Sequence, residues 1–377
     1  MTTPDLAAAD LRVVFLSRKF PPSIGGMQTV AADLWDVVSG RWSRSRLIAW
    51  RGSSRRSVPW MVTAVARLTV ALLRGQVDVV VAGDGLMAIA ARPALALRRV
   101  PALAVVHGLD LTWSVPGYRR LVRWGLRGFD RVLANSANTA ELAAAATGRP
   151  GRIDVLRLGV RLPADPAGPA ERVRARAELL RRWGLPEHGL LVLTLGRMVR
   201  RKGVAWFVEQ VLPGLAGARY LVAGDGPQRA AVLAAATRAG VADRVVLAGS
   251  VTAAERELLL RGADLFVQPN ISVPGDVEGF GLVVVEAALR GTVVLAADLE
   301  GLRDAVVDGR TGLLVRSGDP AAWLARLAEV ADPVRRAELG ERFRAAAATR
   351  YGHQQMGDRL AAILAGIPVR SHPVHSR

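Results

Sequence analysis

The sequence predicts an α/β protein built from two doubly wound domains with a ligand-binding cleft between them. Three observations lead to this prediction. The chain has 377 residues, which is more than one hydrophobic core usually supports. Short apolar strands alternate with longer amphipathic helices, as in a parallel sheet covered by helices. The alternation is interrupted once, at the proline- and glycine-rich stretch 162–169, and then starts again.

The first half is expected to form one Rossmann-like domain over residues 1–163. Its strands are predicted at 12–17, 45–50, 77–82, 102–107, 131–134 and 154–156, and its helices include 27–39, 60–74 and 136–146. Prolines and a glycine then crowd together, so residues 164–186 are predicted to hold the linker and the start of the second domain.

The second half repeats the alternation and predicts a second Rossmann-like domain over residues 187–352. Its strands are expected at 190–195, 219–223, 245–248, 265–268 and 293–296, and its helices at 204–211, 228–239, 253–261, 282–289 and 302–307. Further helices fit 321–330, 337–348 and 354–364, so a C-terminal helix is expected within 353–366. Residues 367–377 are predicted to be a flexible tail.

The composition indicates a globular protein and excludes several chemistries. Hydrophobic residues make up 51% of the chain and charged residues 22%. The absence of cysteine excludes disulfides, thiolate-bound zinc, iron–sulfur clusters and a cysteine nucleophile. The start lacks the basic region of a signal peptide, and no apolar run reaches the ~18 residues of a membrane span. A cytoplasmic protein is therefore expected.

The formal charge of +18 suggests a phosphate-bearing partner: nucleic acid, an anionic membrane or an anionic substrate. The excess is spread along the chain, however, which equally fits a general preference for arginine, and no nucleic-acid partner is expected. Lys19 and Lys202 are the two lysines among the 51 basic residues. Because all the other 49 are arginines, a retained lysine indicates that a compact ammonium is needed there.

Two glutamates flank a glycine-rich turn in the most informative segment, Glu278-Gly-Phe-Gly-Leu-Val-Val-Val-Glu286. The glycines let backbone amides approach a ligand, and the helix that starts after them presents free N–H groups to an anion. Glu278 and Glu286 could then grip hydroxyls at the two ends of a sugar nucleotide. The alternative is a surface glutamate and a helix glutamate with no joint role.

A cationic loop follows the strand predicted at 190–195, in the segment Gly196-Arg-Met-Val-Arg-Arg-Lys-Gly203. Arg197 and Lys202 lie where a strand ends at its carboxyl edge, and could neutralise a diphosphate as it leaves. The loop lacks the spacing of a P-loop. Arg200 and Arg201 could equally form a solvated face.

Two weaker motifs lie in the first domain. Gly25 and Gly26 open a helix after the first strand, where loop backbone can touch donor phosphate or sugar; a simple tight turn is the alternative. His107 ends a strand and could hydrogen-bond sugar or phosphate, although a lone histidine is as often structural.

Together these motifs resemble family 4 retaining glycosyltransferases of the GT-B fold, the group that includes bacterial phosphatidylinositol mannosyltransferases. The similarity runs from Phe20 to about Val315. It is densest in the second half, where Gly224-Asp-Gly-Pro227, Ala263 to Pro269, Glu278 to Glu286 and Asp308 to Leu314 occur in the family's order.

The resemblance implies two Rossmann-like domains facing across a deep cleft, with a C-terminal helix that crosses back to the first domain. It implies transfer of a hexosyl group from a UDP- or GDP-linked donor to a hydroxyl acceptor such as a glycolipid, a polysaccharide precursor or a natural product, without metal or cofactor. Expected catalytic residues are Arg197, Lys202, Glu278 and His107. Expected donor-binding residues are Gly25, Gly26, Gly196, Val251, Phe280, Gly281, Leu282 and Glu286.

In this interpretation the anomeric configuration is retained and the departing phosphate takes the acceptor's proton. The loop 270–277 is longer and more proline-rich than the family's usual link, so donor selection cannot be transferred to it. Two alternatives remain: a catalytically silent sugar-nucleotide-binding or membrane-surface subunit, and a GT-B epimerase. A dinucleotide-dependent oxidoreductase is least favoured, because Gly224-Asp-Gly226 lacks the third glycine of that fingerprint.

Arginine stripes leave membrane contact open. Arg67 and Arg74 share a predicted helix face, and Arg119, Arg120, Arg123 and Arg127 follow Tyr118. Such stripes could hold an anionic bilayer at the inner membrane surface, or be solvated helix faces.

Overall fold

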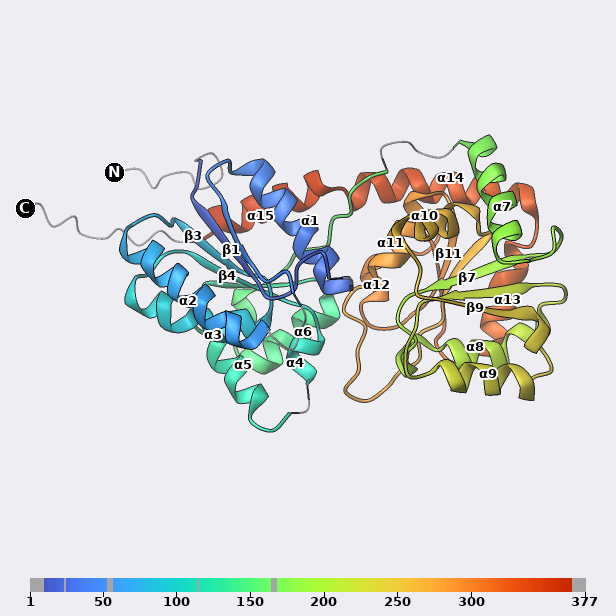
Figure 1. The fold of residues 1–377 in the computed structure, drawn as a ribbon, viewed down its shortest axis with the longest axis horizontal. Coiled ribbons are helices and arrows are strands. Elements are labelled where there is room, and N and C mark those ends of the chain that lie inside the picture. The colour runs from blue at the N-terminus through green and yellow to red at the C-terminus, as the bar shows by residue number, and fades with distance from the viewer. Residues whose placement is uncertain (1–9, 24, 53–56, 114, 164–167, 368–377) are drawn as a thin grey trace, which may run out of the picture. The chain divides into compact units, whose positions relative to one another are not determined.

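The computed structural model describes residues 10–23, 25–52, 57–113, 115–163 and 168–367 (Figure 1). The chain divides into two compact units. One comprises Met1–Gly159 with His353–Arg377, and the other comprises Val160–Gly352. The predicted tail beyond residue 367 and linker residues 164–167 lie outside the described residues.

The first unit contains a six-stranded parallel sheet in the order β2-β1-β3-β4-β5-β6. Its strands are β1 (Val13–Ser17), β2 (Arg46–Ala49), β3 (Val79–Ala82), β4 (Ala102–Val106), β5 (Arg131–Ala134) and β6 (Ile153–Val155). Its helices are α1 (Gly26–Arg41), α2 (Ser57–Leu73), α3 (Gly85–Leu97), α4 (Leu109–Thr112), α5 (Tyr118–Leu126), α6 (Ala137–Thr147) and α15 (His353–Ala365).

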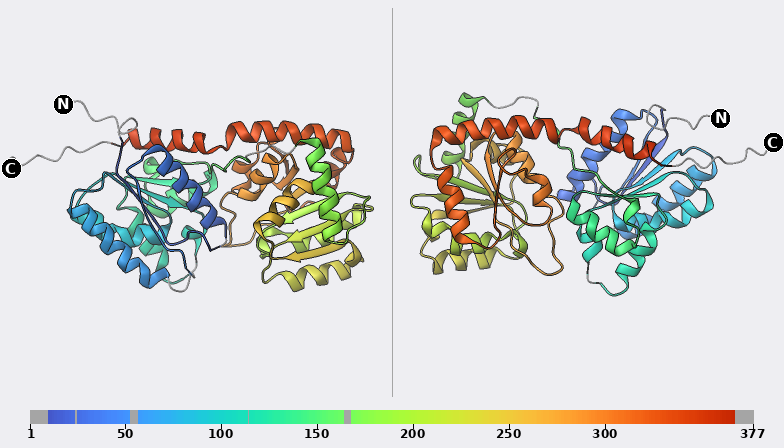
Figure 2. Two further views of the ribbon diagram at one scale, coloured as in Figure 1. Left: turned by 45° about the horizontal axis from the view of Figure 1, so that its top comes forward. Right: turned by 180° about the vertical axis from the view of Figure 1, so that it is seen from behind.

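Two apolar clusters cover the two faces of this sheet. Residues of α1 and α15, among them Leu34, Val38 and Leu360, pack on one face. Residues of α2, α3, α5 and α6, among them Leu68 and Met87, pack on the other. Figure 2 shows α15 alongside α1 from two sides. The C-terminal helix therefore packs in the first unit, as expected from the resemblance.

The second unit contains another six-stranded parallel sheet, in the order β12-β11-β10-β7-β8-β9. Its strands are β7 (Leu191–Leu195), β8 (Arg219–Ala223), β9 (Val245–Gly249), β10 (Leu265–Gln268), β11 (Val293–Ala297) and β12 (Leu313–Val315). Its helices are α7 (Pro169–Arg182), α8 (Val204–Gln210), α9 (Arg229–Arg238), α10 (Ala253–Gly262), α11 (Leu282–Leu289), α12 (Leu302–Ala305), α13 (Pro320–Glu329) and α14 (Pro333–Arg350). Figure 1 shows α8 and α9 on one face of this sheet and α10 and α11 on the other.

Local sequence explains where these elements begin. The central strands, such as β3 and β11, are apolar at every position because helices cover both faces of a parallel sheet. Asp84 caps α3 by accepting from the backbone N–H groups of Leu86 and Met87. Thr252 and Glu255 form a capping box at the start of α10.

The predicted α/β class with two doubly wound domains is confirmed, but some elements were not predicted. Helix α3 is apolar nearly all round and contains Pro93, so its sequence shows no helical period. Helix α7 lies in the stretch expected to hold the linker. It was not predicted, because its apolar residues form only a narrow stripe among many arginines. That stripe packs on α10, and Arg176 pairs with Asp264 at 2.5 Å.

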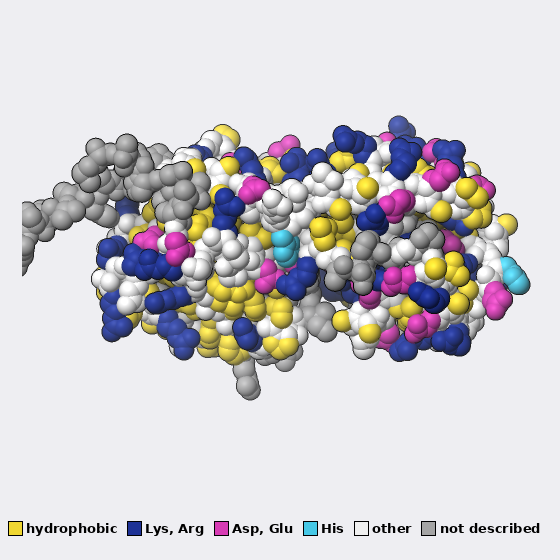
Figure 3. Space-filling view, turned by 90° about the horizontal axis from the view of Figure 1, so that it is seen from above, with side chains coloured by type: hydrophobic (Ala, Val, Ile, Leu, Met, Phe, Trp, Pro, Cys, Tyr) yellow, Lys and Arg dark blue, Asp and Glu magenta, His cyan; other side chains and the backbone are white. Residues whose placement is uncertain are grey.

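No described helix combines the length and the apolar character needed to span a bilayer. On the face shown in Figure 3, Arg and Lys side chains are interspersed with acidic and apolar ones. The positive charge is therefore diffuse on that face.

Candidate active site

The candidate site lies at the carboxyl edge of the second sheet. Strands β11, β10 and β7 are neighbours, so the loops that follow them meet at one edge. Lys202 lies in a short 3-10 turn, Arg200–Lys202, after β7. Glu278 follows β10, and Glu300 follows β11.

Lys202 and Glu278 form a buried ion pair, with each residue only 8% exposed. The Lys202 Nζ atom lies 2.6 Å from Glu278 Oε2. Asn270 Nδ2 donates to the same oxygen at 3.1 Å, and Arg201 Nε lies 3.6 Å from it. No donor in the described part of the chain contacts the other carboxylate oxygen, Oε1, so a ligand hydroxyl can use it.

The charges around Glu278 keep it ionised. Burial would raise the pKa of its carboxyl, but the charges of Lys202 and Arg201, with hydrogen bonds from Lys202 and Asn270, outweigh that effect and hold the pKa at about 2. Glu278 is therefore a permanent acceptor near neutral pH. It cannot serve as a general acid there.

Supporting contacts fix this pair in place. Gln268 Nε2 donates to Asn270 Oδ1 at 2.6 Å, and Arg201 Nη1 donates to Asp276 Oδ1 at 2.8 Å. Gly203 adopts a left-handed conformation with φ of 65°, and a Cβ atom there would lie 1.8 Å from the Pro269 carbonyl oxygen. Only glycine lets the cationic loop approach the end of β10 so closely.

Arg197 differs from Lys202 in its surroundings. Its side chain is exposed and makes no hydrogen bond or ion pair with the residues that the structure describes. Gly196, beside it, donates its N–H to the Ala223 carbonyl at 2.9 Å. Because Arg197 has no protein counter-charge among these residues, its charge is available to an anion.

The start of α11 offers backbone donors. Gly281 is the N-cap residue, with φ of 85° and no side-chain cap, and Leu282 is the first helical residue. The Phe280 side chain is buried against Tyr351, with ring centroids 6.1 Å apart, so only its backbone can face a ligand. This uncapped helix start, carrying the positive end of the helix dipole, suits a phosphate group.

Glu286 and Val251, which were predicted to contact the nucleotide, are less exposed than Arg197. The Glu286 carboxylate is buried in α11 and forms an ion pair with Arg256 of α10. Val251 is half-buried, directly before Thr252, the N-cap of α10, and close to the end of β9. The structure thus brings Glu286 and Arg256 together, a pairing the sequence pattern did not predict.

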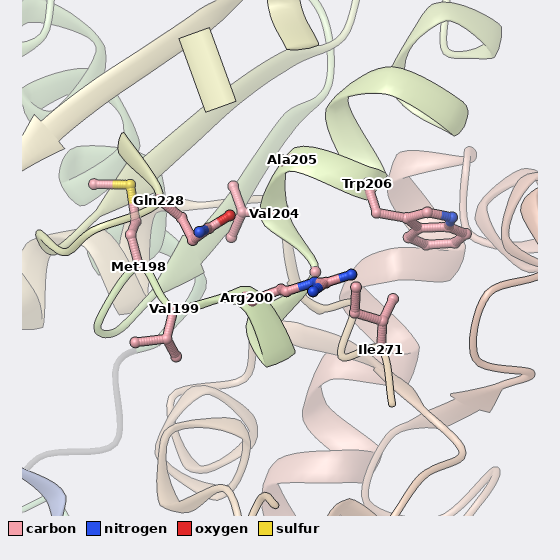
Figure 4. Close-up of a pocket in the computed structure, with 9 residues that line it drawn as sticks. Met198, Val199, Arg200, Val204, Ala205, Trp206, Gln228 and Ile271 are labelled. Carbon is pink, nitrogen blue, oxygen red and sulfur yellow. The ribbon is translucent and has the colours of Figure 1, made fainter. Parts of the chain in front are cut away.

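A cavity of about 140 Å³ lies beside the cationic loop (Figure 4). It is lined by Met198, Val199, Arg200, Gly203, Val204, Ala205, Trp206, Gln228 and Ile271. Among the described residues, none of those predicted to bind the sugar-nucleotide donor lines this cavity. The loop that carries Arg197 and Lys202 therefore borders a hollow that the sequence did not predict.

The first unit places its candidates along its own carboxyl edge. Gly25 caps α1 and Gly26 begins it, and a Cβ atom at Gly26 would meet nothing within 4 Å. His107 follows β4, and its Nε2 lies 2.9 Å from the Gly83 carbonyl oxygen. Since a carbonyl can only accept, Nε2 carries a proton and Nδ1 is left for another partner.

Within the described residues, one group of side chains could hold a metal ion: Asp33, Asp36 and His353. His353 Nε2 lies 3.0 Å from Asp33 Oδ1, which ties α15 to α1. None of the residues predicted to bind the sugar-nucleotide donor belongs to this group.

Sequence reasoning missed four polar residues around Glu278: Asn270, Asp276, Arg201 as a partner, and Glu300. All four lie in loops after the carboxyl ends of β7, β10 and β11, which is the signal that could have identified them. Glu300 accepts a hydrogen bond from the Glu278 backbone N–H at 2.5 Å. Burial raises the pKa of the Glu300 carboxyl, partly opposed by that bond.

Known families match both halves of the chain. Residues 5–162 match the model of Glycosyltransferase Family 4, and residues 189–332 match that of Glycosyl transferases group 1. A GDP-mannose-dependent alpha-(1-6)-phosphatidylinositol monomannoside mannosyltransferase of Mycobacterium tuberculosis is 30% identical over 347 residues, 82% of this chain and 87% of that protein. A D-inositol 3-phosphate glycosyltransferase of Segniliparus rotundus is 34% identical over 242 residues, 62% of this chain and 51% of that protein. The match thus spans about half the length of the second relative.

Solved structures share the fold. The Anabaena HepE protein in complex with UDP and glucose aligns with a TM-score of 0.75 at 19% identity, covering 94% of this chain and 99% of that one. Sucrose-phosphate synthase from Thermosynechococcus elongatus aligns with a TM-score of 0.73 at 17% identity, covering 93% and 98%.

The two α/β domains, each with a parallel sheet, together with the family matches, identify a glycosyltransferase of the GT-B fold. The chain belongs to glycosyltransferase family 4, the glycosyl transferases group 1.

Proposed function

We propose that this protein transfers a hexosyl group from a UDP- or GDP-linked sugar to a hydroxyl acceptor, with retention of configuration and without a metal ion. The main observation behind this proposal is that the buried carboxylate of Glu278 is held ionised by Lys202, with one oxygen left for a ligand hydroxyl. The relatives named for GDP-mannose and D-inositol 3-phosphate, and the HepE complexes with UDP, support this donor and acceptor chemistry.

In this proposal the cationic residues bind the diphosphate and the acidic residues bind hydroxyl groups of the donor. Arg197 and the start of α11 meet the diphosphate, and Lys202, whose ammonium has three donors, keeps Glu278 in place and can reach the leaving group with another N–H. Glu278 Oε1 accepts from a hydroxyl of the transferred sugar, and Glu286 from the ribose. Gly196 and Val251 line the phosphate and base ends. Gly25, Gly26 and His107 are the first unit's contributions.

Retention is proposed to depend on the leaving phosphate. Glu278, fixed as a carboxylate and paired with Lys202, is a poor base, since its pKa is about 2. We therefore propose that the departing phosphate oxygen takes the proton of the acceptor hydroxyl on the same face of the sugar.

Nucleotide sugars are expected to stabilise the protein against heat. A donor that binds only the folded state adds about 2.7 kcal/mol at roughly 100 times its Kd. UDP, GDP, UDP-glucose and GDP-mannose are the probes for a thermal-shift series, repeated in EDTA. We expect one nucleotide series to raise Tm equally with and without EDTA, and its sugar form to be hydrolysed or transferred with the anomeric configuration kept, as read by NMR.

The same measurements of Tm and donor consumption distinguish the proposed transferase from a silent binding subunit and from an epimerase. Binding without hydrolysis or transfer would favour a silent sugar-nucleotide-binding subunit, and conversion of the donor to an epimer would favour an epimerase. If no probe shifted Tm and none was consumed, the proposed function would be wrong.

We also propose that the acceptor is reached at an anionic membrane surface. Helices α2 and α5 each pack on α3 and carry exposed apolar side chains, namely Val58, Val62, Leu121 and Trp124. Arg119 and Arg120 are exposed on α5. We refer to these residues together as the α2–α5 surface, because their apolar and cationic groups match an anionic bilayer.

Two arginines of the predicted basic stripe, Arg123 and Arg127, make structural hydrogen bonds instead. Arg123 Nε donates to the Ala146 carbonyl at 2.7 Å, and Arg127 Nε donates to the Thr147 carbonyl at 3.0 Å. Both carbonyls lie at the end of α6, where a cation is favourable. A test of membrane binding should therefore leave these two in place.

The double substitution Arg119→Glu/Arg120→Glu is expected to abolish co-sedimentation with anionic liposomes, since each cation near such a surface contributes about 1 kcal/mol. The wild-type protein should pellet with phosphatidylserine vesicles and stay in solution with phosphatidylcholine vesicles. Arg335→Glu, an exposed arginine of α14, is the matched control. Equal pelleting of the double variant and the wild type would contradict the membrane proposal.

A further inference from the structure

Glu300 has an unusual backbone conformation. Its φ is 49°, and every other positive φ in the described part of the chain belongs to glycine. The left-handed region is unfavourable for a residue with a Cβ atom, so such a conformation persists only where surrounding contacts hold it. Glu300 lies in the turn between β11 and α12, at the same sheet edge as Lys202 and Glu278.

The turn Glu300–Gly301 holds the backbone of Glu278 on both sides. The Glu278 N–H donates to Glu300 Oε2 at 2.5 Å, and the Gly301 N–H donates to the Glu278 carbonyl oxygen at 3.2 Å. The approach is close, because a Cβ atom at Gly301 would lie 2.2 Å from the Gly279 carbonyl oxygen. Both polar backbone groups of Glu278 are therefore bound by two consecutive residues.

The side chain of Glu278 is held from elsewhere, by Lys202 and Asn270. Backbone and carboxylate thus have separate anchors. Without the backbone anchor, Glu278 would precede a segment with two glycines, since Gly279 follows it directly and Gly281 lies three residues after it. The backbone anchor adds a second constraint to these side-chain contacts on the direction in which Oε1 points.

We propose that Glu300 is a positioning residue, whose carboxylate, presented by a left-handed turn, fixes the Glu278 peptide and so aligns Glu278 Oε1 with the transferred sugar. This inference rests on the proposed function. It assigns a role to an acid that neither the motifs nor the family resemblance identified.

Three substitutions separate positioning from simple stability. Glu300→Gly removes the hydrogen bond but relieves the backbone, so we expect an unchanged or higher Tm together with a kcat for donor hydrolysis lowered about 10- to 100-fold, the range for a lost hydrogen bond to a charged group. Glu300→Ala keeps the unfavourable backbone and loses the bond, so both Tm and kcat should fall. Glu300→Gln keeps an acceptor oxygen and should recover most of the kcat lost in Glu300→Gly.

Nucleotide binding gives the second readout. The dissociation constant of UDP or GDP, whichever the wild type binds, should stay within about twofold in Glu300→Gly, because the nucleotide is not held by Glu278. Glu338→Gln, an exposed acid on α14, is the control. Equal kcat in Glu300→Gly and wild type, or a parallel loss of Tm and nucleotide binding, would overturn the inference alone. A wild-type protein that neither binds nor consumes nucleotide sugars would overturn the proposed function as well.

Discussion

Replacing Lys202 with methionine is expected to lower both turnover and stability sharply. Methionine keeps the length of the side chain but leaves the buried Glu278 carboxylate without its 2.6 Å partner. Removing one member of a buried ion pair typically costs about 3–5 kcal/mol in the free energy of unfolding. Loss of one donor to a leaving charge typically costs ~10²–10³ in kcat. Chemical denaturation and donor-hydrolysis kinetics measure the two effects.

A second substitution distinguishes the two effects. In Lys202→Met/Glu278→Gln neither charge of the pair remains, so most of the lost stability should return while turnover stays low. Arg200→Ala is the matched control, an exposed cation on the same loop without an ion pair among the described residues. A Lys202→Met variant with nearly normal kcat would refute the role proposed for Lys202.

The pH dependence of stability gives a further check on this pair. The pKa of Glu278 is about 2 in the folded protein, below the ordinary value of 4.5. Its ionisation therefore stabilises the folded state fully above pH 4.5, and that contribution is lost as the pH falls from 4.5 toward 2. In Lys202→Met the pKa of Glu278 should rise, so the decline in Tm over this range should become shallower.

The fold followed from periodicity and composition because its central strands are short apolar runs between helices. Strands such as β5, β8 and β10 have the predicted bounds. The prediction failed for two helices that lack a clear amphipathic pattern: α3 is apolar nearly all round, and α7 has only a narrow apolar stripe between arginines. Neither helix has the regular apolar spacing that the prediction depends on.

The candidate site was only partly predictable, for a physical reason. The segments around Lys202 and Glu278 have recognisable spacing, and the structure places these two side chains in contact. Asn270, Asp276 and Glu300 come from separate loops, and they meet only because β11, β10 and β7 are neighbours in the sheet. Strand order is not encoded in the local sequence, so these contacts could not be read from it. The roles of the individual site residues stay predictions.

Arg197→Ala is expected to separate catalysis from stability most cleanly. Its guanidinium is exposed and has no ion pair within the residues described, so its loss should change the free energy of unfolding by no more than about 0.5 kcal/mol. The proposed contact with the leaving diphosphate predicts a ~10²–10³-fold fall in kcat. Thermal melting and steady-state donor hydrolysis test the two statements on one preparation.

Arg197→Lys adds a test of geometry, because lysine keeps the charge but loses the planar fork that can bind two phosphate oxygens at once. Partial recovery of kcat relative to Arg197→Ala is therefore expected, together with a stronger dependence on salt than in Arg197→Ala, which lacks the charge. Arg200→Ala again serves as the neighbouring control. A normal kcat in Arg197→Ala would mean that the diphosphate leaves without this cation, and the division of charge between Arg197 and Lys202 would then have to be abandoned. A stable but inactive Arg197→Ala, beside an unstable and inactive Lys202→Met, is the pattern that only one exposed and one buried cation can produce.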